Sequence, residues 1–297
     1  MIEEISYRWK INLERLQDAK NRLARWWNFK EFFTSRELRE LFLFSTFIFI
    51  LCALLVQFLL TFMTAFLLRH YSISFSWSIF WIKFPYYSFE HWSMFRIYFV
   101  NSAGMLVLFF TGAILVDKRF GHWKWRLIIT WLTFILINIL PTGLLAGIFW
   151  YNEFGIAYIW LFQSIIARSV IAIIAMLIII FFKPYWIQKF LETTYTTAFL
   201  SDGRNIEKYI KYCMILPWIA GTMVLLAFGI PKHAWFWMVS LLGLGFVILP
   251  VYPERISPMG IEIYKTGKKI FPVRNPLIFI IIILLVLWIA SFYKISF

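Results

Sequence analysis

Long apolar runs dominate the pattern of hydrophobic and polar positions along this chain. The first run, residues 41–68, contains no charged residue and is long enough for a tilted helix through a hydrocarbon core about 30 Å thick. Six further runs follow it, so the pattern predicts an all-α polytopic membrane protein of about seven transmembrane helices, within a range of six to eight. The predicted spans lie near residues 41–68, 97–116, 127–150, 156–182, 213–230, 234–251 and 277–292.

A different pattern follows the first span. Residues 72–79 alternate strictly between serine and apolar or aromatic residues, which is typical of a short strand with one polar and one apolar face. The stretch from there to residue 92 is rich in Trp and Tyr, which favour the headgroup level of a bilayer. We therefore expect a short β-like hairpin or a re-entrant element on the outer side.

The first 34 residues have the pattern of a basic amphipathic helix. Leu and Trp residues recur on one predicted face, and Lys and Arg supply much of the remainder. Such a helix lies in the membrane interface or docks on a partner. The segment Thr34 to Glu37 fits a capping box, so the first span should begin in the mid-thirties. We treat residues 35–297 as a single multi-span domain.

Composition and charge agree with a lipid environment. The hydrophobic set makes up 62% of the 297 residues and charged residues 15%, with a mean hydropathy of +0.76, which excludes a soluble enzyme and a disordered protein. Of the 29 Lys and Arg residues, 23 fall on one side of the alternating topology and 5 on the other. By the positive-inside rule, this asymmetry predicts a cytoplasmic N-terminus and an outer C-terminus.

This topology is typical of a bacterial inner membrane, and an organelle inner membrane is the alternative location. The expected partners are the lipid bilayer and other membrane proteins or a second copy of the chain, but not nucleic acid. The net charge of +14 is interpreted as membrane orientation, because no nucleic-acid-binding motif accompanies it. Both cysteines, Cys52 and Cys213, lie in apolar runs and are expected in the core.

Arg168 is the most unusual single residue, because it interrupts an apolar run. If one helix covers residues 156–182, Arg168 lies near the middle of the membrane, where an ionisable group indicates function. It would then need a partner such as Gln163. In the alternative, residues 156–166 form a short re-entrant or tilted segment and the span runs from Ser169 to Trp186. Arg168 then lies at the outer interface.

Other polar residues and glycines in the spans have two interpretations. Asn101, Asn138 and Gln163 either hydrogen-bond across helices or line a substrate path or pore. The pairs Gly143 and Gly147, and Gly104 and Gly112, allow close helix packing.

Known catalytic motifs are missing from the sequence. It has no His-Glu-x-x-His pair, no phosphate-binding Walker loop and no Gly-x-Ser-x-Gly segment. His70, His91 and Glu90 are weak candidates for a metal site on the outer side, and interfacial histidines are the simpler interpretation. We expect no cofactor and no catalytic residue.

Three segments carry a family resemblance. Asn101-Ser102-Ala103-Gly104, and the stretch from Asn138 to Gly147, resemble the Asn-containing and Gly-containing segments of site-2-type intramembrane metalloproteases. Pro217-Trp218-Ile219-Ala220-Gly221 is similar to a later span of bacterial membrane proteins at the edge of that family. The zinc ligands of the family have no counterpart here. The resemblance therefore implies a scaffold without protease chemistry.

Three functions remain open from the sequence. The first is a non-catalytic subunit or accessory or assembly factor of a membrane complex. The second is a transporter or channel that uses Arg168 and the amides within the spans, because helices broken by proline often line binding sites. The third is a membrane enzyme with an outer-side site built on His70, Glu90 and His91.

Overall fold

The computed structural model describes residues 35–78, 81–83, 93–118, 122–149 and 164–227, together with 281, 285, 289, 295 and 296. These residues are mostly helical. The helices are α3 (Arg36–His70), α4 (Met94–Leu115), α5 (Trp123–Phe149), α7 (Ile165–Leu191), α8 (Gly203–Ile210) and α9 (Leu216–Ala227). A 3₁₀ turn, η2 (Thr197–Leu200), precedes α8, and a π-helical turn, η3 (Lys211–Ile215), joins α8 to α9. The strands are β1 (Ser76–Ser78), β2 (Trp81–Lys83) and β3 (Ile295–Ser296).

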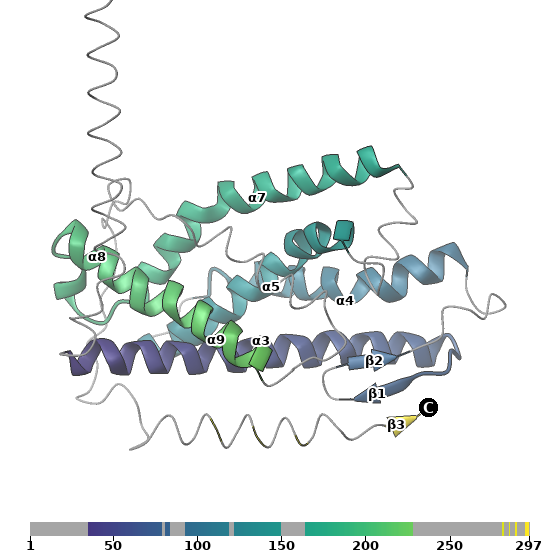
Figure 1. Ribbon diagram of the computed structural model, residues 1–297, viewed down its shortest axis with the longest axis horizontal. Coiled ribbons are helices and arrows are strands. Elements are labelled where there is room, and N and C mark those ends of the chain that lie inside the picture. Colours follow the sequence, from purple (N-terminus) through teal and green to yellow (C-terminus); the bar gives the residue numbers. More distant parts are fainter. Residues whose placement is uncertain are drawn as a thin grey trace, which may run out of the picture.

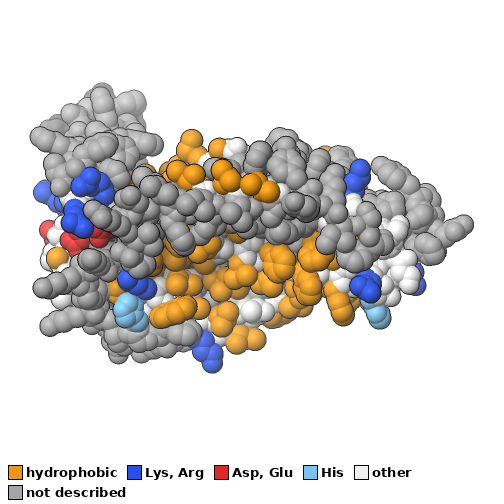
Figure 2. Space-filling view, turned by 90° about the horizontal axis from the view of Figure 1, so that it is seen from below, with side chains coloured by type: hydrophobic (Ala, Val, Ile, Leu, Met, Phe, Trp, Pro, Cys, Tyr) orange, Lys and Arg blue, Asp and Glu red, His pale blue; other side chains and the backbone are white. Residues whose placement is uncertain are grey.

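Among the described residues, five helical stretches are long and apolar enough to cross a membrane. They are Arg36–His70, Phe95–Leu115, Trp123–Leu145, Ile165–Leu191 and Gly203–Ala227. A helix rises about 1.5 Å per residue, so a core of about 30 Å needs about 20 residues, and each of the five meets that length. Figure 2 shows the matching surface, with apolar side chains across the middle of the face and the acidic ones at one end. The prediction of a helical membrane protein is confirmed at this level.

The first helix begins where the capping signal predicts, although a different residue caps it. Ser35 has an extended backbone, and its hydroxyl accepts a bond from the Leu38 N–H at 3.4 Å. Ser35 rather than Thr34 is therefore the N-cap. Glu37 then falls one position too early to complete a capping box, and its carboxylate contacts Tyr195 instead.

The fourth predicted span needs correction. Ser164 has an extended backbone and α7 begins at Ile165, so no single helix runs from 156 to 182. The helix also continues past the apolar run to Leu191, because Trp186, Ile187 and Phe190 still find buried positions beyond Lys183.

The fifth predicted span, 213–230, begins too late for a similar reason. Asp202 caps α8 by accepting the Asn205 N–H at 2.7 Å, and the chain stays helical from Gly203 to Ala227. The predicted spans at 234–251 and 277–292 lie outside the described residues, apart from helical positions 281, 285 and 289.

The bundle is organised around α3. Helix α3 contacts α4, α5 and α9. Helix α5 in turn contacts both α4 and α7. Figure 1 shows α3 (purple) along one side and α7 (teal) along the opposite side. The centre is aromatic: the Trp131 ring lies 5.0 Å from that of Phe49 and 4.7 Å from that of Phe190. Edge-to-face packing of this kind stabilises a core beyond simple burial.

The segment after α3 and residues Ile295–Ser296 form a small sheet in the order β2-β1-β3. β1 pairs antiparallel with β2, with Trp77 opposite Ile82, and antiparallel with β3, with Trp77 opposite Ile295. The chain end at β3 therefore lies beside the segment that follows α3 (Figure 1). All of the aromatic stretch between β2 and residue 93 lies outside the described residues, so the outer element predicted there is described only in part.

Candidate functional site: a charged pocket at one end of the bundle

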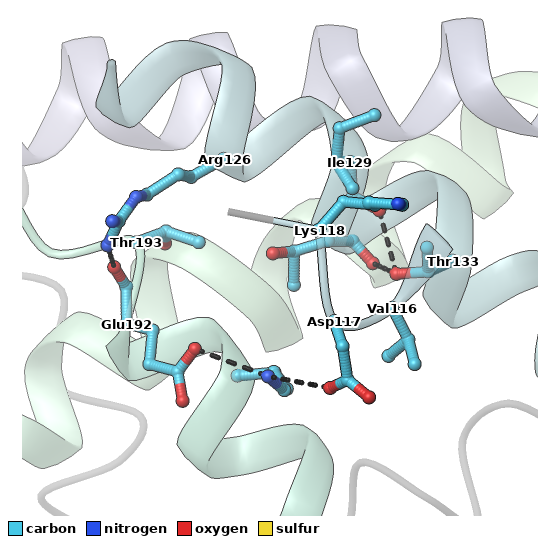
Figure 3. A pocket seen from close by; sticks show the side chains of 10 residues that line it. Val116, Asp117, Lys118, Arg126, Ile129, Thr133, Glu192 and Thr193 are labelled. Carbon is cyan, nitrogen blue, oxygen red and sulfur yellow. Dashed lines mark hydrogen bonds and ion pairs between the residues drawn. The ribbon is translucent and has the colours of Figure 1, made fainter. Parts of the chain in front are cut away.

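A charged pocket lies where α4 ends, α5 begins and α7 ends. It encloses about 70 Å³. Figure 3 shows its lining side chains converging from these three helices. The lining residues are Val116, Asp117, Lys118, Arg126, Ile129, Thr130, Thr133, Lys189, Glu192 and Thr193. Three are cationic and two anionic, so the lining carries a formal charge of +1. The pocket lies at the end of the bundle that the charge asymmetry predicts to be cytoplasmic.

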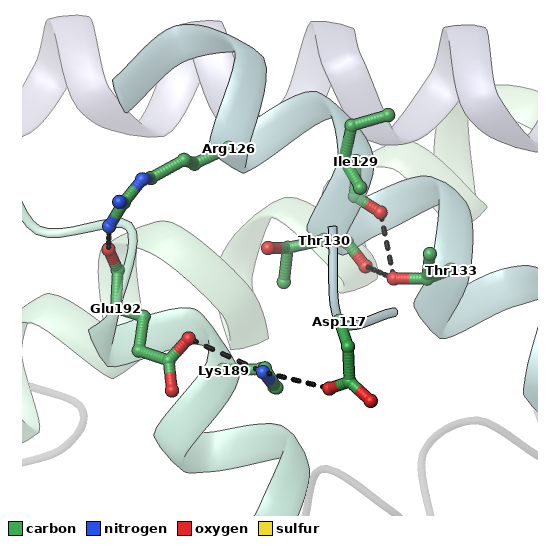
Figure 4. Close-up of polar contacts among 7 residues, drawn as sticks. All are labelled: Asp117, Arg126, Ile129, Thr130, Thr133, Lys189 and Glu192. Atoms are coloured by element: carbon green, nitrogen blue, oxygen red, sulfur yellow. Dashed lines mark hydrogen bonds and ion pairs between the residues drawn. The ribbon is translucent and has the colours of Figure 1, made fainter. Parts of the chain in front are cut away.

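Three interactions hold the charged groups in place. The Lys189 Nζ lies 3.5 Å from an Asp117 carboxylate oxygen and 3.4 Å from one of Glu192, and so links α7 to the end of α4 (Figure 4). The Arg126 guanidinium donates to the Glu192 backbone carbonyl at 3.4 Å. That carbonyl belongs to the C-cap of α7, where backbone carbonyls lack helical partners and a cation is favourable.

A second polar cluster is buried in the bundle beside this end. The Ser45 hydroxyl donates to the Cys213 backbone carbonyl at 2.5 Å and accepts from the Trp131 indole N–H at 2.8 Å. Cys213 lies in the π-helical turn, four residues before Pro217. Because proline has no N–H, it cannot donate to the carbonyl four residues before it. Ser45 supplies a donor to that carbonyl from another helix.

The link between α7 and α8 is anchored by two tyrosines. The Tyr195 hydroxyl donates to Glu37 at 2.9 Å, and the Tyr209 hydroxyl lies 2.7 Å from that of Thr193. Burial, followed by the nearby Glu37 carboxylate, raises the pKa of Tyr195 well above its ordinary value. The phenol therefore remains a neutral hydrogen-bond donor across the ordinary pH range.

Two of the amides predicted within the spans each bond to a carbonyl of their own helix. The Asn101 amide donates to the Ile97 carbonyl and the Asn138 amide to the Phe134 carbonyl, both at 2.7 Å and both within their own helices. Asn101 and Asn138 are buried. Such bonds satisfy each amide within its own helix and do not cross to a neighbouring one. Gln163 lies outside the described residues.

Arg168 lies in the first turn of α7, at the opposite end of that helix from Lys189. Its position matches the alternative in which the span starts near Ser169, and not a site in the middle of a helix. Its side chain is part-buried. The structure therefore does not bring Arg168 together with Asn101 and Asn138 as parts of one described pocket.

The proposed outer metal site is described only in part. His70 is the last residue of α3 and its ring packs edge-on against Tyr71 at 5.2 Å. His91 and Glu90 lie outside the described residues. Over the part of the chain that the structure describes, no group of three His, Cys, Asp or Glu side chains is placed to hold a metal ion.

Glycines lie at close helix contacts. A Cβ on Gly112 would lie 2.8 Å from the Leu136 Cβ of α5, and one on Gly104 would lie 3.1 Å from Leu60 of α3. Gly143 and Gly147 both lie in α5. Gly221 was not predicted as a contact, yet a Cβ there would collide with the Phe49 ring of α3.

Sequence reasoning missed the residues that make the pocket and the buried cluster. Nothing in the local sequence around Lys189, Asp117 and Glu192 shows that three segments meet there. One signal for Ser45 was present: Pro217 within an apolar run implies a backbone carbonyl in need of a donor. Both cysteines are buried and free, as predicted for core residues.

Comparisons with known proteins add no relative: no family model matches the chain, and no significant match is found among curated proteins or solved structures. The resemblance to site-2-type metalloproteases stays a prediction.

Proposed function

We propose that this chain is a non-catalytic multi-pass membrane protein that serves as an accessory or assembly subunit of a membrane complex. The main support for the proposal comes from the hydrogen bonds that polar groups make inside the spans. Asn101 and Asn138 donate to carbonyls of their own helices, and Ser45 bonds Cys213 and Trp131. The Ser45 bonds hold helices together, which is what a scaffold requires, whereas the two amides are satisfied within their own helices.

The exposure of α7 supports the same proposal. Only 17% of its most apolar 18 residues are buried, against 67% in α3 and in α5. The buried side of its first two thirds is a stripe of Ala172, Ala175 and Ile179, spaced three and four residues apart. The rest of this part exposes Ile, Leu and Phe side chains. In a membrane these must meet lipid or other apolar helices, and a subunit of a complex would use such a surface.

The orientation is part of the proposal. The pairing of β3 with β1 puts the chain end beside the segment that follows α3, away from the start of α3. This placement supports an odd number of membrane crossings between the start of α3 and the chain end, and seven spans satisfy that condition. With the basic end cytoplasmic, the N-terminus is inside and a bacterial inner membrane is the proposed location.

Single cysteines test the orientation. Ser201 lies at the basic end and Ser74 after α3, and both are exposed. The variants S201C and S74C should react with a membrane-impermeant maleimide from opposite faces, S74C in intact cells and S201C only after permeabilisation. Native Cys52 and Cys213 are buried, so wild type is the matched background. Labelling of both variants in intact cells would contradict the topology.

The subunit role is tested by purification in mild detergent from the native membrane, with mass spectrometry of co-purifying proteins. A photo-crosslinking residue at Leu177, 56% exposed on α7, should capture a second protein. The matched control is the same residue at Ile114, 68% exposed on α4. A stoichiometric partner captured from Leu177 supports the role. A lone chain that crosslinks only to lipid from both positions contradicts it.

A further inference from the structure

The charge balance of the pocket between α4, α5 and α7 suits a singly charged anion. Lys118, Arg126 and Lys189 face Asp117 and Glu192 across one small space, leaving a formal charge of +1. Most buried or half-buried cations are matched by acids or carbonyls. A phosphodiester carries one negative charge and would bring the lining to neutrality.

The geometry separates the roles of the charged groups. Lys189 is 20% exposed at its side chain and is linked to both carboxylates, whereas Asp117 is 83% exposed and lies at the mouth. Arg126 enters from the first turns of α5 and is fixed by the Glu192 carbonyl. A guanidinium presents donors in a planar fork that matches phosphate oxygens. Lys118 lies on the exposed link between α4 and α5.

The depth of the pocket points to a lipid. It lies where three apolar helices end or begin, which is the headgroup level of a bilayer. The helical face of α7 that carries Lys189 continues into the membrane through Tyr185, Phe182 and Ile178, and the last two are 48% and 44% exposed. The Lys189 Nζ lies 5.5 Å from the centre of the Tyr185 ring. Lys189 of the pocket thus lies on the same face of α7 as exposed apolar side chains.

We propose that this pocket binds the phosphodiester headgroup of a membrane phospholipid, with Arg126 and Lys118 at the phosphate and the acyl chains along the exposed face of α7. The enclosed 70 Å³ has room for several water molecules or one phosphate-sized group. Basic pockets between membrane helices on the cytoplasmic side bind lipid headgroups in this manner. The two carboxylates favour a single phosphodiester over a more highly charged headgroup.

The test is native mass spectrometry of the full chain in mild detergent, titrated with dioleoyl phosphatidylglycerol. Hydrogen bonds to a charged group contribute about 1.5–3 kcal/mol, so R126Q should weaken lipid binding about tenfold or more. K118Q should weaken it by a smaller factor, and because Lys118 is exposed this variant keeps the test valid if R126Q misfolds. The matched control is R204Q, which removes one exposed charge at the same end, outside the pocket.

Three outcomes decide the proposal. Weaker binding in R126Q and K118Q with wild-type binding in R204Q supports it. Equal loss in R204Q and K118Q shows general attraction to a basic end and overturns the pocket. Displacement of the lipid by inorganic phosphate at matched concentration shows that the site recognises free phosphate, and overturns the assignment to a lipid.

Discussion

Replacing Ser45 with alanine removes one hydroxyl that serves two helices at once. Ser45 is fully buried, donates to the Cys213 carbonyl at 2.5 Å and accepts from the Trp131 indole at 2.8 Å. Alanine fits the same space and is a better helix former, by about 0.5 kcal/mol. Any loss of stability therefore reports the two hydrogen bonds, without a contribution from side-chain bulk.

The size of the loss follows from the surroundings. Hydrogen bonds between membrane helices contribute about 0.6 kcal/mol on average and up to about 1.7. In this case two bonds are lost together, and Pro217 has no N–H to offer the Cys213 carbonyl in place of the hydroxyl. We expect S45A to lower the free energy of unfolding by about 1–3 kcal/mol.

The measurement is unfolding of the full chain from mild detergent by added dodecyl sulfate, followed by tryptophan fluorescence. The matched control is T46A. The Thr46 hydroxyl is also buried but donates to the Phe42 carbonyl of its own helix, so its loss should cost less than about 0.5 kcal/mol. A second test places S45A in a P217A background, where residue 217 gains an N–H and an α-helical bond from it would end at the Cys213 carbonyl. There S45A should cost less than it does alone.

Two results would refute this reasoning. Equal destabilisation by S45A and T46A would show that the cross-helix bonds add nothing beyond a local one. If the effects of S45A and P217A are strictly additive, the missing N–H of Pro217 is not the reason that the Cys213 carbonyl depends on Ser45.

Two further predictions concern packing and pH. G221A should lower stability by about 1–3 kcal/mol, because a Cβ there would collide with the Phe49 ring. The control G203A should be tolerated, because a Cβ at Gly203 has no atom within 4 Å. Equal effects of the two variants in thermal unfolding would contradict this prediction. Because the folded pKa of Tyr195 is raised, its contribution to stability is present below an unfolded pKa of about 10 and is lost as pH rises beyond it. Y195F should therefore lose less stability than wild type between pH 9 and 11. Identical profiles of unfolding free energy against pH for the two proteins would contradict the raised pKa of Tyr195.

Local patterns in the sequence predicted a large part of the fold. The apolar runs predicted the membrane helices, because burial in lipid depends on the composition of each segment alone. Boundaries were less accurate. The start of α7 at Ile165 and the helical continuation from Gly203 depend on caps and on tertiary burial beyond the apolar run. Arg168 was ambiguous for the same reason, because its depth depends on where the helix starts.

What the sequence by itself determined is the solvent of each segment: lipid for the long apolar runs, water for the charged ends. What only the tertiary structure decided is which polar groups meet. Ser45 and Cys213 are 168 residues apart, and Lys189 meets Asp117 from a different helix. The physical reason is that hydropathy is a property of a segment, whereas a hydrogen bond or an ion pair needs two groups within about 3–4 Å. That proximity is set by how whole helices pack, through contacts such as Gly112 on Leu136, and no local pattern encodes it.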